Sequence, residues 1–489
     1  MQNSKTDNKT EQSHGTGVRT ARNSVYLMSS QMAARFLGMV ISVWLAHYLG
    51  DTLFGRYIFI ITIVGFARIA SNFGMDQVLI RSVAADRKHA REYLGSGLVS
   101  RFGIFLVGFI PLLIFIALIN KPMDLKAGLL IGYVAVVFIS MNQTFDNIFN
   151  GFERFGLPAI MRIAAKVAQF GMIVVAIHLE LGLLWVVATL VFSELVRSVF
   201  LWLVSLKNWG MPEIKTSRIK SITLQSIPFV GIMILAMIKS RSDVIILGLY
   251  CDDEVVGWYG AAINLMFALL IVSSSASNAL FPVFSRLSGT AQKQKLVAAN
   301  HKSIKLLLIL GLPVALSISM LSGRIISLLY PETFKPAALV LAITIWSVPI
   351  IFINSTIIRI IISLHHEKLR LWIGVISASL CIISNLILIP IYEEIGAAVT
   401  NLFFAFFSTA LCIFFAEYKI IKLKYPVKAL LKMTPPLGAL ALCIFFLKQE
   451  SLFILIPAGI VIYTAGILLL RVIDPDELKL IMNVFIPGK

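Results

Sequence analysis

The sequence predicts an all-α polytopic membrane protein of about fourteen transmembrane helices. Three observations lead to this prediction: 58% of the residues are hydrophobic, only 14% are charged, and the mean hydropathy is +0.88. Soluble domains are closer to half apolar and a quarter charged. The apolar residues also stand in blocks of roughly twenty, the length that a helix needs to cross the hydrocarbon core of a bilayer.

The apolar blocks fix the predicted spans, and charged or glycine- and proline-containing stretches separate them. Residues 1–23 precede the first block and are rich in Asn, Thr, Gln and Ser. They lack the apolar core and cleavage site of a signal peptide, so we expect a disordered cytoplasmic tail. The span 434–448 is short and contains Pro435 and Pro436, which a helix interior disfavours. The predicted spans are 24–47, 57–77, 96–118, 127–147, 159–178, 182–205, 225–248, 257–281, 304–329, 337–360, 370–390, 395–416, 434–448 and 452–471.

Charged residues in the loops predict the orientation of the chain. Lys and Arg dominate the loops on one side, for example at 207–220 and 419–432, whereas Asp252, Asp253 and Glu254 lie on the other side. Cytoplasmic loops of membrane proteins carry such an excess of Lys and Arg. We therefore expect a multi-pass protein of the cell (inner) membrane with both termini in the cytoplasm.

Residues 75–91 lie between the second and third predicted spans and have two faces. Met75, Leu79 and Val83 recur at helical spacing on one face, and Arg87 and Arg91 lie on another. This pattern is typical of an amphipathic helix at the membrane interface.

A short motif occurs twice, once after the first span and once after the seventh. Residues 51–57 and 253–259 both read Asp-x-x-x-Gly-x-Tyr and are 202 positions apart. Because six spans separate the copies, the two halves have the same orientation and are related by an axis along the membrane normal. The sequence therefore predicts two six-helix lobes, 24–222 and 223–418, followed by two additional helices and a cytoplasmic tail in 419–489. We expect both copies of the motif at the external surface.

The second copy of the motif and the segment before it carry a family resemblance. Residues 241–248, Arg-Ser-Asp-Val-Ile-Ile-Leu-Gly, and the motif at 253–259 resemble a signature of polysaccharide transporters. These are the Wzx-type lipid-linked oligosaccharide flippases of the multidrug/oligosaccharidyl-lipid/polysaccharide exporter superfamily. Residues 45–57, 72–75 and 150–155 are similar to the first half of that family. The resemblance implies twelve core helices in two lobes. It also implies that a polyprenyl-pyrophosphate-linked oligosaccharide moves from the inner to the outer leaflet by alternating access, for cell-surface polysaccharide biosynthesis.

Ionisable residues inside the predicted spans are the candidate functional residues. A charged side chain near the bilayer centre costs about 2.5–3.5 kcal/mol on insertion scales, so it normally faces a protein interior or water. We expect Arg35, Arg68, Lys239 and Arg241 to line a cationic substrate-binding cavity. Such a cavity suits the pyrophosphate that the resemblance implies, because guanidinium groups hold phosphate oxygens through paired hydrogen bonds.

Two pairs of opposite charge at helical spacing have a second interpretation. Lys239 and Asp243 are four apart, and Glu194 and Arg197 are three apart, so each pair can lie on one helix face. Asp243, Glu194 and Arg197 are therefore candidates either for coupling or for structural pairing between helices. Arg241 is two residues from Asp243 and is expected on a different face. The cations nearer the span ends, whose side chains are expected to extend to the interface, are Arg162, Lys166, Arg324 and Arg359.

Composition and motifs narrow the function classes. The formal net charge of +18 follows the loops, so it indicates membrane orientation and argues against nucleic acid as a partner. The sequence has no Walker-type phosphate loop and no Cys or His cluster with metal spacing, so we expect no cofactor, no metal site and no enzymatic activity. A cation-coupled multidrug exporter is one alternative, although it would favour buried carboxylates over these cations. A membrane-embedded glycan polymerase or glycosyltransferase is the alternative from another class, and the short loops argue against it. The expected partners are the lipid-linked glycan, membrane lipid, and a glycan polymerase or glycosyltransferases.

Overall fold

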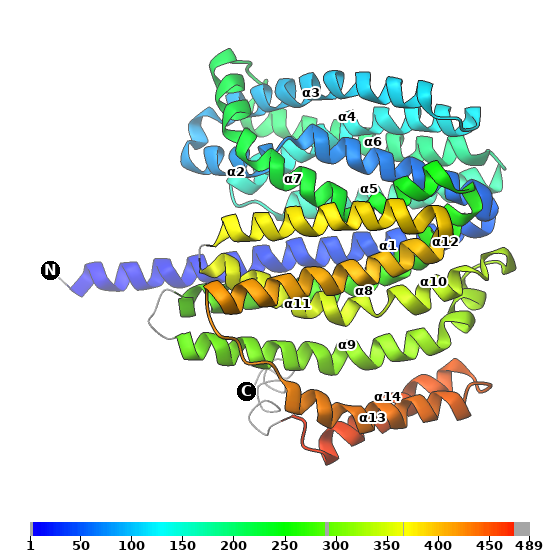
Figure 1. Cartoon of the computed structure of the whole chain (residues 1–489). Coiled ribbons are helices and arrows are strands. Elements are labelled where there is room, and N and C mark those ends of the chain that lie inside the picture. The colour runs from blue at the N-terminus through cyan, green and yellow to red at the C-terminus, as the bar shows by residue number, and fades with distance from the viewer. Residues whose placement is uncertain (1–2, 289–292, 365, 474–489) are drawn as a thin grey trace. The chain divides into compact units, whose positions relative to one another are not determined.

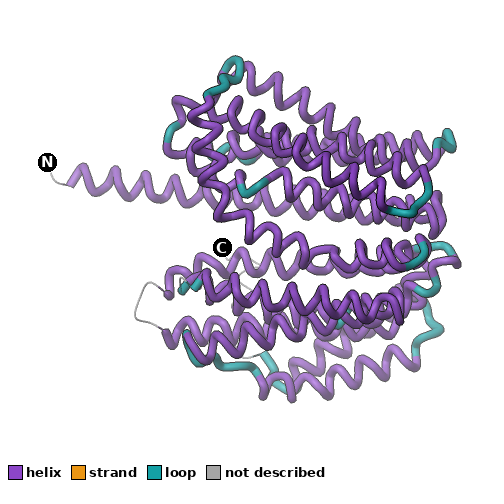
Figure 2. The backbone as a smooth tube through the Cα atoms, turned by 45° about the horizontal axis from the view of Figure 1, so that its top comes forward, coloured by secondary structure: helices purple, strands orange, loops and turns teal. Residues whose placement is uncertain are grey.

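A computed structural model describes residues 3–288, 293–364 and 366–473. Within these residues the regular elements are all helical, and short loops join them (Figure 2). The chain divides into two compact units, 1–261 and 262–489. Each unit is considered by itself below.

The first unit is built from seven helices and the beginning of an eighth in the described residues (Figure 1). A single turn of 3-10 helix, Arg87–His89, lies between the second and the third. The helices are α1 (Asn3–Asn72), α2 (Met75–Ala85), α3 (Ala90–Leu118), α4 (Met123–Gly151), α5 (Gly156–His178), α6 (Gly182–Trp209), α7 (Thr216–Tyr250) and α8 (Asp253–Ser288).

Helix α1 supplies the first two predicted spans because it is broken at one glycine. Gly50 has φ 68° and ψ −179°, a conformation that is essentially restricted to glycine. The break lies between the predicted spans 24–47 and 57–77. At its other end α1 begins at Asn3, whereas the sequence predicts a disordered tail at 1–23. No proline occurs in that stretch to stop the helix.

Helix α2 corrects the prediction of an interfacial amphipathic helix. The helix is present, but Met75, Val78, Leu79 and Val83 are buried. They pack in an apolar cluster with α4 residues such as Phe145. The apolar face of α2 therefore contacts protein, because α4 offers it a complementary apolar surface.

The second unit contains the remainder of α8 and six further helices in its described part. Helix α12 is broken at Glu393 (φ 49°), which separates the predicted spans 370–390 and 395–416. Helices α10 and α11 together correspond to the span 337–360. A short 3-10 turn, Glu332–Phe334, precedes α10. The six helices are α9 (Lys293–Leu329), α10 (Ala337–Thr344), α11 (Ser347–Ser363), α12 (Glu367–Lys419), α13 (Val427–Phe446) and α14 (Leu452–Leu469).

Helix α13 is longer than the predicted span 434–448 and contains both prolines. Pro435 has no N–H for the carbonyl of Leu431, but the Thr434 hydroxyl donates to that carbonyl oxygen at 2.8 Å. Membrane helices tolerate proline where Ser or Thr side chains satisfy the freed backbone groups. Pro436 of α13 lies against Gly466 of α14. The two helices run side by side in Figure 1. The prolines are therefore accommodated inside the helix.

The architecture is that of an all-α polytopic membrane protein. Each predicted span corresponds to a helix or half-helix of the described chain. Ten stretches of the described residues are long and apolar enough to cross a membrane, and those in α1 and α12 each cover two predicted spans. The first unit includes α7, which the repeat assigns to the second lobe, 223–418. The units are defined by how compactly the chain packs, whereas the lobes were predicted from the repeated motif. The predicted lobe boundaries therefore stay a prediction.

Candidate functional site

Two of the four cations predicted to line a cavity have described side chains. Arg68, in the second half of α1, is exposed, and Arg241, in α7, is half-buried. The side chains of Arg35 and Lys239 lie outside the described residues. The gathering of these four residues in one cavity therefore stays a prediction.

Helix α7 is irregular at Arg241, whose backbone has φ −158° and ψ 25°. The sequence prediction placed Arg241 and Asp243 on different faces because it assumed a regular helix. Arg241 and Asp243 lie within electrostatic range of each other. Asp243 also accepts a hydrogen bond from the hydroxyl of Tyr259, a fully buried residue of α8 and of the repeated motif. The predicted pairing of Asp243 with Lys239 lies outside the described residues.

The predicted Glu194–Arg197 pair is present in α6, with 3.6 Å between the charged atoms. A closer partner of Arg197 comes from α4, since its Nη2 atom donates to the Oδ2 atom of Asp146 at 2.7 Å. Asn142, one turn before Asp146, donates to the Glu194 carboxylate at 2.8 Å. Asn142, Asp146 and Arg197 are all buried, with at most 8% of their surface exposed. A polar cluster that the sequence did not predict therefore connects α4 and α6.

Helix α5 extends this polar cluster and corrects a second prediction. Arg162 was expected to extend to the interface, but its Nη2 atom donates to the Oδ2 atom of Asp146 at 3.1 Å. Its side chain is 26% exposed. Lys166, one turn further, donates to the amide oxygen of buried Gln169 at 2.8 Å. Lys166 is also within electrostatic range of Glu194, Arg68 and Arg197. Arg162 is thus bound to α4, and Lys166 is bound within α5 and lies within electrostatic range of Glu194 on α6.

The two copies of the repeated motif are in contact within the first unit. A Cβ atom on Gly55 would lie 1.7 Å from the backbone oxygen of Asp253, and one on Gly257 would lie 2.4 Å from the backbone oxygen of Asp51. The contacts are reciprocal, as expected for symmetry-related copies. Only glycine permits so close an approach of backbone to backbone. The copies therefore lie on the same side of the fold, as the parallel repeat requires.

Ion pairs surround this contact between the motifs. Arg56 donates to Asp253 from Nε at 2.7 Å and to Asp124 of α4 from Nη1 at 2.6 Å. Lys121, in the α3–α4 loop, donates to the other oxygen of Asp253 at 2.8 Å. Thr52 donates to Glu254 at 3.2 Å. Ion pairs and a hydrogen bond thereby join α1, the α3–α4 loop and the first turns of α4 and α8.

A second buried network lies among α1, α2, α3 and α4. Arg101 of α3 has a side chain only 1% exposed and donates to Asp76 of α2 at 2.7 Å. It also donates to Gln143 of α4 at 2.9 Å and to Asn72 at 3.2 Å. Asn147 of α4 donates to Asp76 at 2.6 Å. Sequence analysis missed this network because its members come from four helices.

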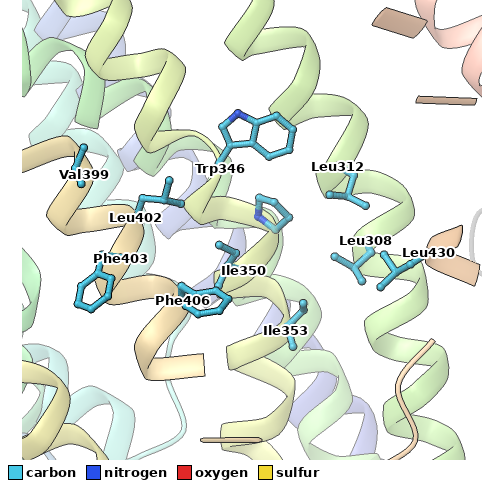
Figure 3. Close-up of a pocket in the computed structure, with 11 residues that line it drawn as sticks. Leu308, Leu312, Trp346, Ile350, Ile353, Val399, Leu402, Phe403, Phe406 and Leu430 are labelled. Atoms are coloured by element: carbon cyan, nitrogen blue, oxygen red, sulfur yellow. The ribbon is translucent and has the colours of Figure 1, made fainter. Parts of the chain in front are cut away.

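The second unit contains an apolar cavity of about 630 Å³. Figure 3 shows Phe403 and Phe406 of α12 on one side, Leu308 of α9 on the opposite side, and Trp346 and Ile350 between them. Of its lining residues, only Trp346 carries a polar side-chain atom, and its indole nitrogen donates to the hydroxyl of Ser319 at 3.2 Å. The cavity therefore offers apolar surface and no charge.

A bundle of membrane-crossing helices with charged clusters inside it is typical of a membrane transporter. The family described as "Polysaccharide biosynthesis protein" matches residues 20–288, more than half of the chain, so this chain belongs to that family. A second family, MatE, matches residues 228–387. The family resemblance predicted from the sequence is thereby confirmed.

Known proteins agree with this assignment. "Probable flippase AglR" of Haloferax volcanii is 23% identical over 433 residues, which cover 88% of this chain and 90% of that protein. The solved structure "Lipid II flippase MurJ, inward closed conformation" has a TM-score of 0.77 at 16% identity, over 91% of this chain and 99% of that one. An inward-facing multidrug resistance MATE family transporter has a TM-score of 0.61 at 13% identity, over 79% of this chain and 94% of that one. The chain therefore shares its fold with both solved structures.

Proposed function

We propose that this protein is a flippase that moves a polyprenyl-pyrophosphate-linked oligosaccharide from the inner to the outer leaflet, for cell-surface polysaccharide biosynthesis. The observation that carries the proposal is the excess of cations between membrane-spanning helices of the first unit. Within the described part of the polar cluster, the three cations Arg162, Lys166 and Arg197 are grouped with two carboxylates, those of Asp146 and Glu194. Arg68 is a further cation within electrostatic range of Lys166. Membership of the polysaccharide family and the flippase names of AglR and MurJ support the same conclusion.

Transport occurs by alternating access between two six-helix lobes, 24–222 and 223–418, with the helices of 419–489 as an addition. The protein lies in the cell membrane with both termini in the cytoplasm and both motif copies at the external surface. Arg35, Arg68, Lys239 and Arg241 contribute to a cationic substrate cavity between the lobes. The protein catalyses no covalent chemistry, and a glycan polymerase or glycosyltransferases act on the cargo before or after it.

Reconstitution tests the transport activity directly. Liposomes with the purified protein and a polyprenyl-pyrophosphate-linked oligosaccharide receive a membrane-impermeant glycosidase. We expect the glycosidase to digest nearly all of the glycan, whereas protein-free liposomes retain the half that faces inward. The variant Lys207→Ala, at an exposed cation near the end of α6, should behave as wild type. Folded protein that leaves the protected half intact would contradict the flippase function.

Reporter fusions test the orientation. Fusions at Lys207 and Lys424 should report a cytoplasmic location, and a fusion at Asp253 an external one. An external signal at Lys424 would refute the proposed topology.

A cation-coupled multidrug exporter is the second candidate, because the MatE family matches residues 228–387. A drug-sensitive host expressing the protein would then become resistant to cationic dyes. We expect no such resistance, since the described polar cluster has more cations than carboxylates and would repel a cationic cargo.

A further inference from the structure

The apolar cavity of the second unit has one wall of exposed aromatic residues. Phe403 and Phe406 of α12 are 43% and 62% exposed, whereas Leu308 on the opposite wall is 3% exposed (Figure 3). Lipid chains are as apolar as these side chains and contact them wherever they face the bilayer. The volume of about 630 Å³ lies within the range of ligand pockets, about 300–1,000 Å³. The cavity can therefore receive a hydrocarbon chain from the surrounding bilayer, but it offers nothing to a polar head group.

One end of the cavity lies close to the linker between α12 and α13. Leu430, which lines the cavity, belongs to the first turn of α13. On α9, Leu308 follows His301 by seven residues, so the two lie on the same helix face about 10 Å apart. The Nδ1 atom of His301 lies 3.3 Å from the backbone oxygen of Lys424 in the linker. The linker is therefore within about two helical turns of the cavity.

The segments at this end of the second unit carry a strong excess of positive charge. Residues 293–302 and 417–432 contain eight lysines and one carboxylate, that of Glu417. All eight lysines are exposed. Basic pockets between helices on the cytoplasmic side of a membrane bind anionic lipid head groups. The lysines are Lys293, Lys295, Lys302, Lys419, Lys422, Lys424, Lys428 and Lys432.

We propose that the cavity binds an acyl chain of an anionic phospholipid of the inner leaflet, whose head group lies against the lysines of the α12–α13 linker. The apolar cavity and the cationic linker match the two halves of such a lipid. A zwitterionic phospholipid would fill the cavity equally well but would bring no net charge to the lysines. This inference goes beyond the proposed flippase function and does not depend on it.

The bound chain would connect α13 to the core of the second unit. The cavity is lined from α9, α11, α12 and α13, so a chain inside it contacts all four helices. A ligand that binds the folded state stabilises it, so the anionic lipid should raise the Tm of the purified protein. The lipid would thus act as a structural partner of the first of the two additional helices.

The fluorescence of Trp346 tests the site directly, because Trp346 lines the cavity. The full-length protein is reconstituted in phosphatidylcholine vesicles with a minor fraction of phosphatidylglycerol brominated on its acyl chains, since bromine quenches indole fluorescence on contact. The difference between wild type and Trp346→Phe gives the signal of Trp346. We expect brominated phosphatidylglycerol to quench this signal at a mole fraction several-fold below that of brominated phosphatidylcholine. Trp185, an exposed residue of α6 whose signal is isolated in the same way, should show no such preference.

Substitutions separate the two halves of the site. Ile353→Phe enlarges a side chain of the lining and should abolish the preferential quenching, whereas Ile462→Phe, on the exposed surface of α14, should leave it unchanged. The double variant Lys424→Gln, Lys428→Gln should lower the effect of phosphatidylglycerol to that of phosphatidylcholine. Its control is Lys207→Gln, Lys220→Gln, which removes two exposed lysines of the first unit. If Ile353→Phe fails to fold, the lysine variants still decide the question, because their positions are exposed.

Each outcome supports or overturns the site. Equal quenching of Trp346 by both brominated lipids would mean that lipid merely surrounds the protein, and an equal loss in both lysine double variants would assign the effect to general surface charge. Either result would overturn the proposal. Undecaprenyl phosphate, added as an unbrominated competitor, should relieve no more quenching than unbrominated phosphatidylglycerol. Stronger relief would assign the cavity to the carrier chain, and none of these results bears on whether the protein flips glycan.

Discussion

Replacing Gly55 by alanine should separate the two motif copies and destabilise the protein. The added Cβ would lie 1.7 Å from the backbone oxygen of Asp253 and 2.7 Å from its carbonyl carbon. Both are backbone atoms, so no rotamer change relieves the overlap. The shortest common carbon–oxygen contact is about 3.3 Å, so the loops must move apart by about 1.6 Å.

The ion pairs around the motif contact determine how much that movement costs. Arg56 and Lys121 bind Asp253 at 2.7 and 2.8 Å, and a shift of this size takes both beyond hydrogen-bonding distance. Their side chains are 19% and 14% exposed, so water replaces the lost contacts only in part. Overpacking costs about 1–3 kcal/mol. Because the backbone and the ion pairs move together here, we expect Gly55→Ala to lower the free energy of unfolding by about 3 kcal/mol, the upper end of that range.

The assay is thermal unfolding of the purified protein in detergent, followed by size-exclusion chromatography of the soluble fraction. Gly65→Ala is the matched control, since it lies in the same helix α1 and its Cβ would meet nothing within 4 Å. Alanine is favoured over glycine in a helix interior by up to ~1 kcal/mol, so this control should be neutral or stabilising. Gly257→Ala places its Cβ 2.4 Å from the backbone oxygen of Asp51. Its Tm should therefore lie between the Tm values of the Gly55 and Gly65 variants. Equal Tm values for the Gly55 and Gly65 variants would refute the reasoning.

Three further changes have defined outcomes. Gly50→Ala should lower stability by about 1–3 kcal/mol through backbone strain alone, because φ is 68° while the space around the Cβ is empty; a Tm equal to wild type would contradict this. The His89 hydrogen bond, the main cause, lowers the pKa of Asp86, so this carboxylate stabilises the fold above its ordinary pKa of ~3.9. The difference in Tm between wild type and Asp86→Asn should therefore shrink as pH falls below that value and through the lowered pKa of the folded state. A constant difference from pH 7 to pH 3 would exclude the effect. Arg101→Met should cost about 3 kcal/mol by leaving Asp76 without its cation, and Asp76→Asn in the same chain should recover part of the lost Tm.

The sequence predicted the helices well because their signal is composition. Blocks of about twenty apolar residues have one stable arrangement in a bilayer, a helix, whatever its neighbours are. The predicted ends of helices were less accurate where a neighbouring side chain compensates for a residue that normally disfavours a helix. The span predicted at 434–448 contains two prolines that a helix interior disfavours, but Thr434 satisfies the carbonyl that Pro435 leaves free, and α13 begins at Val427.

The candidate site was predicted only where both partners lie on one helix. Glu194 and Arg197 are three apart, and their pairing follows from helix geometry. Asp146 is 16 positions from Arg162 and 51 from Arg197, and helical spacing gives no information about partners on other helices. For the same reason Arg162 was assigned to the interface, although Asp146 holds it inward. The role of Arg241 stays a prediction, and the structure adds only that α7 is irregular at that residue.

One sequence signal for these networks does exist, and it lies in α4. Ser140, Gln143 and Asn147 recur at intervals of three and four, so they form one polar stripe along the second half of the helix. Asn142 and Asp146, four apart, form a second stripe on a different face. Polar stripes on a membrane helix predict partners in the protein, because lipid offers none.

The two stripes of α4 explain why one helix connects both networks of the first unit. The first stripe receives Arg101 from α3, and the second receives Arg197 from α6 and Arg162 from α5. A rotation of α4 about its axis would break both sets of hydrogen bonds together. Hydrogen bonds and ion pairs therefore hold helices α3, α5 and α6 to α4 as one frame. Alternating access of the rocking kind needs such a frame, since each lobe must move as one body while its ligand contacts stay in place.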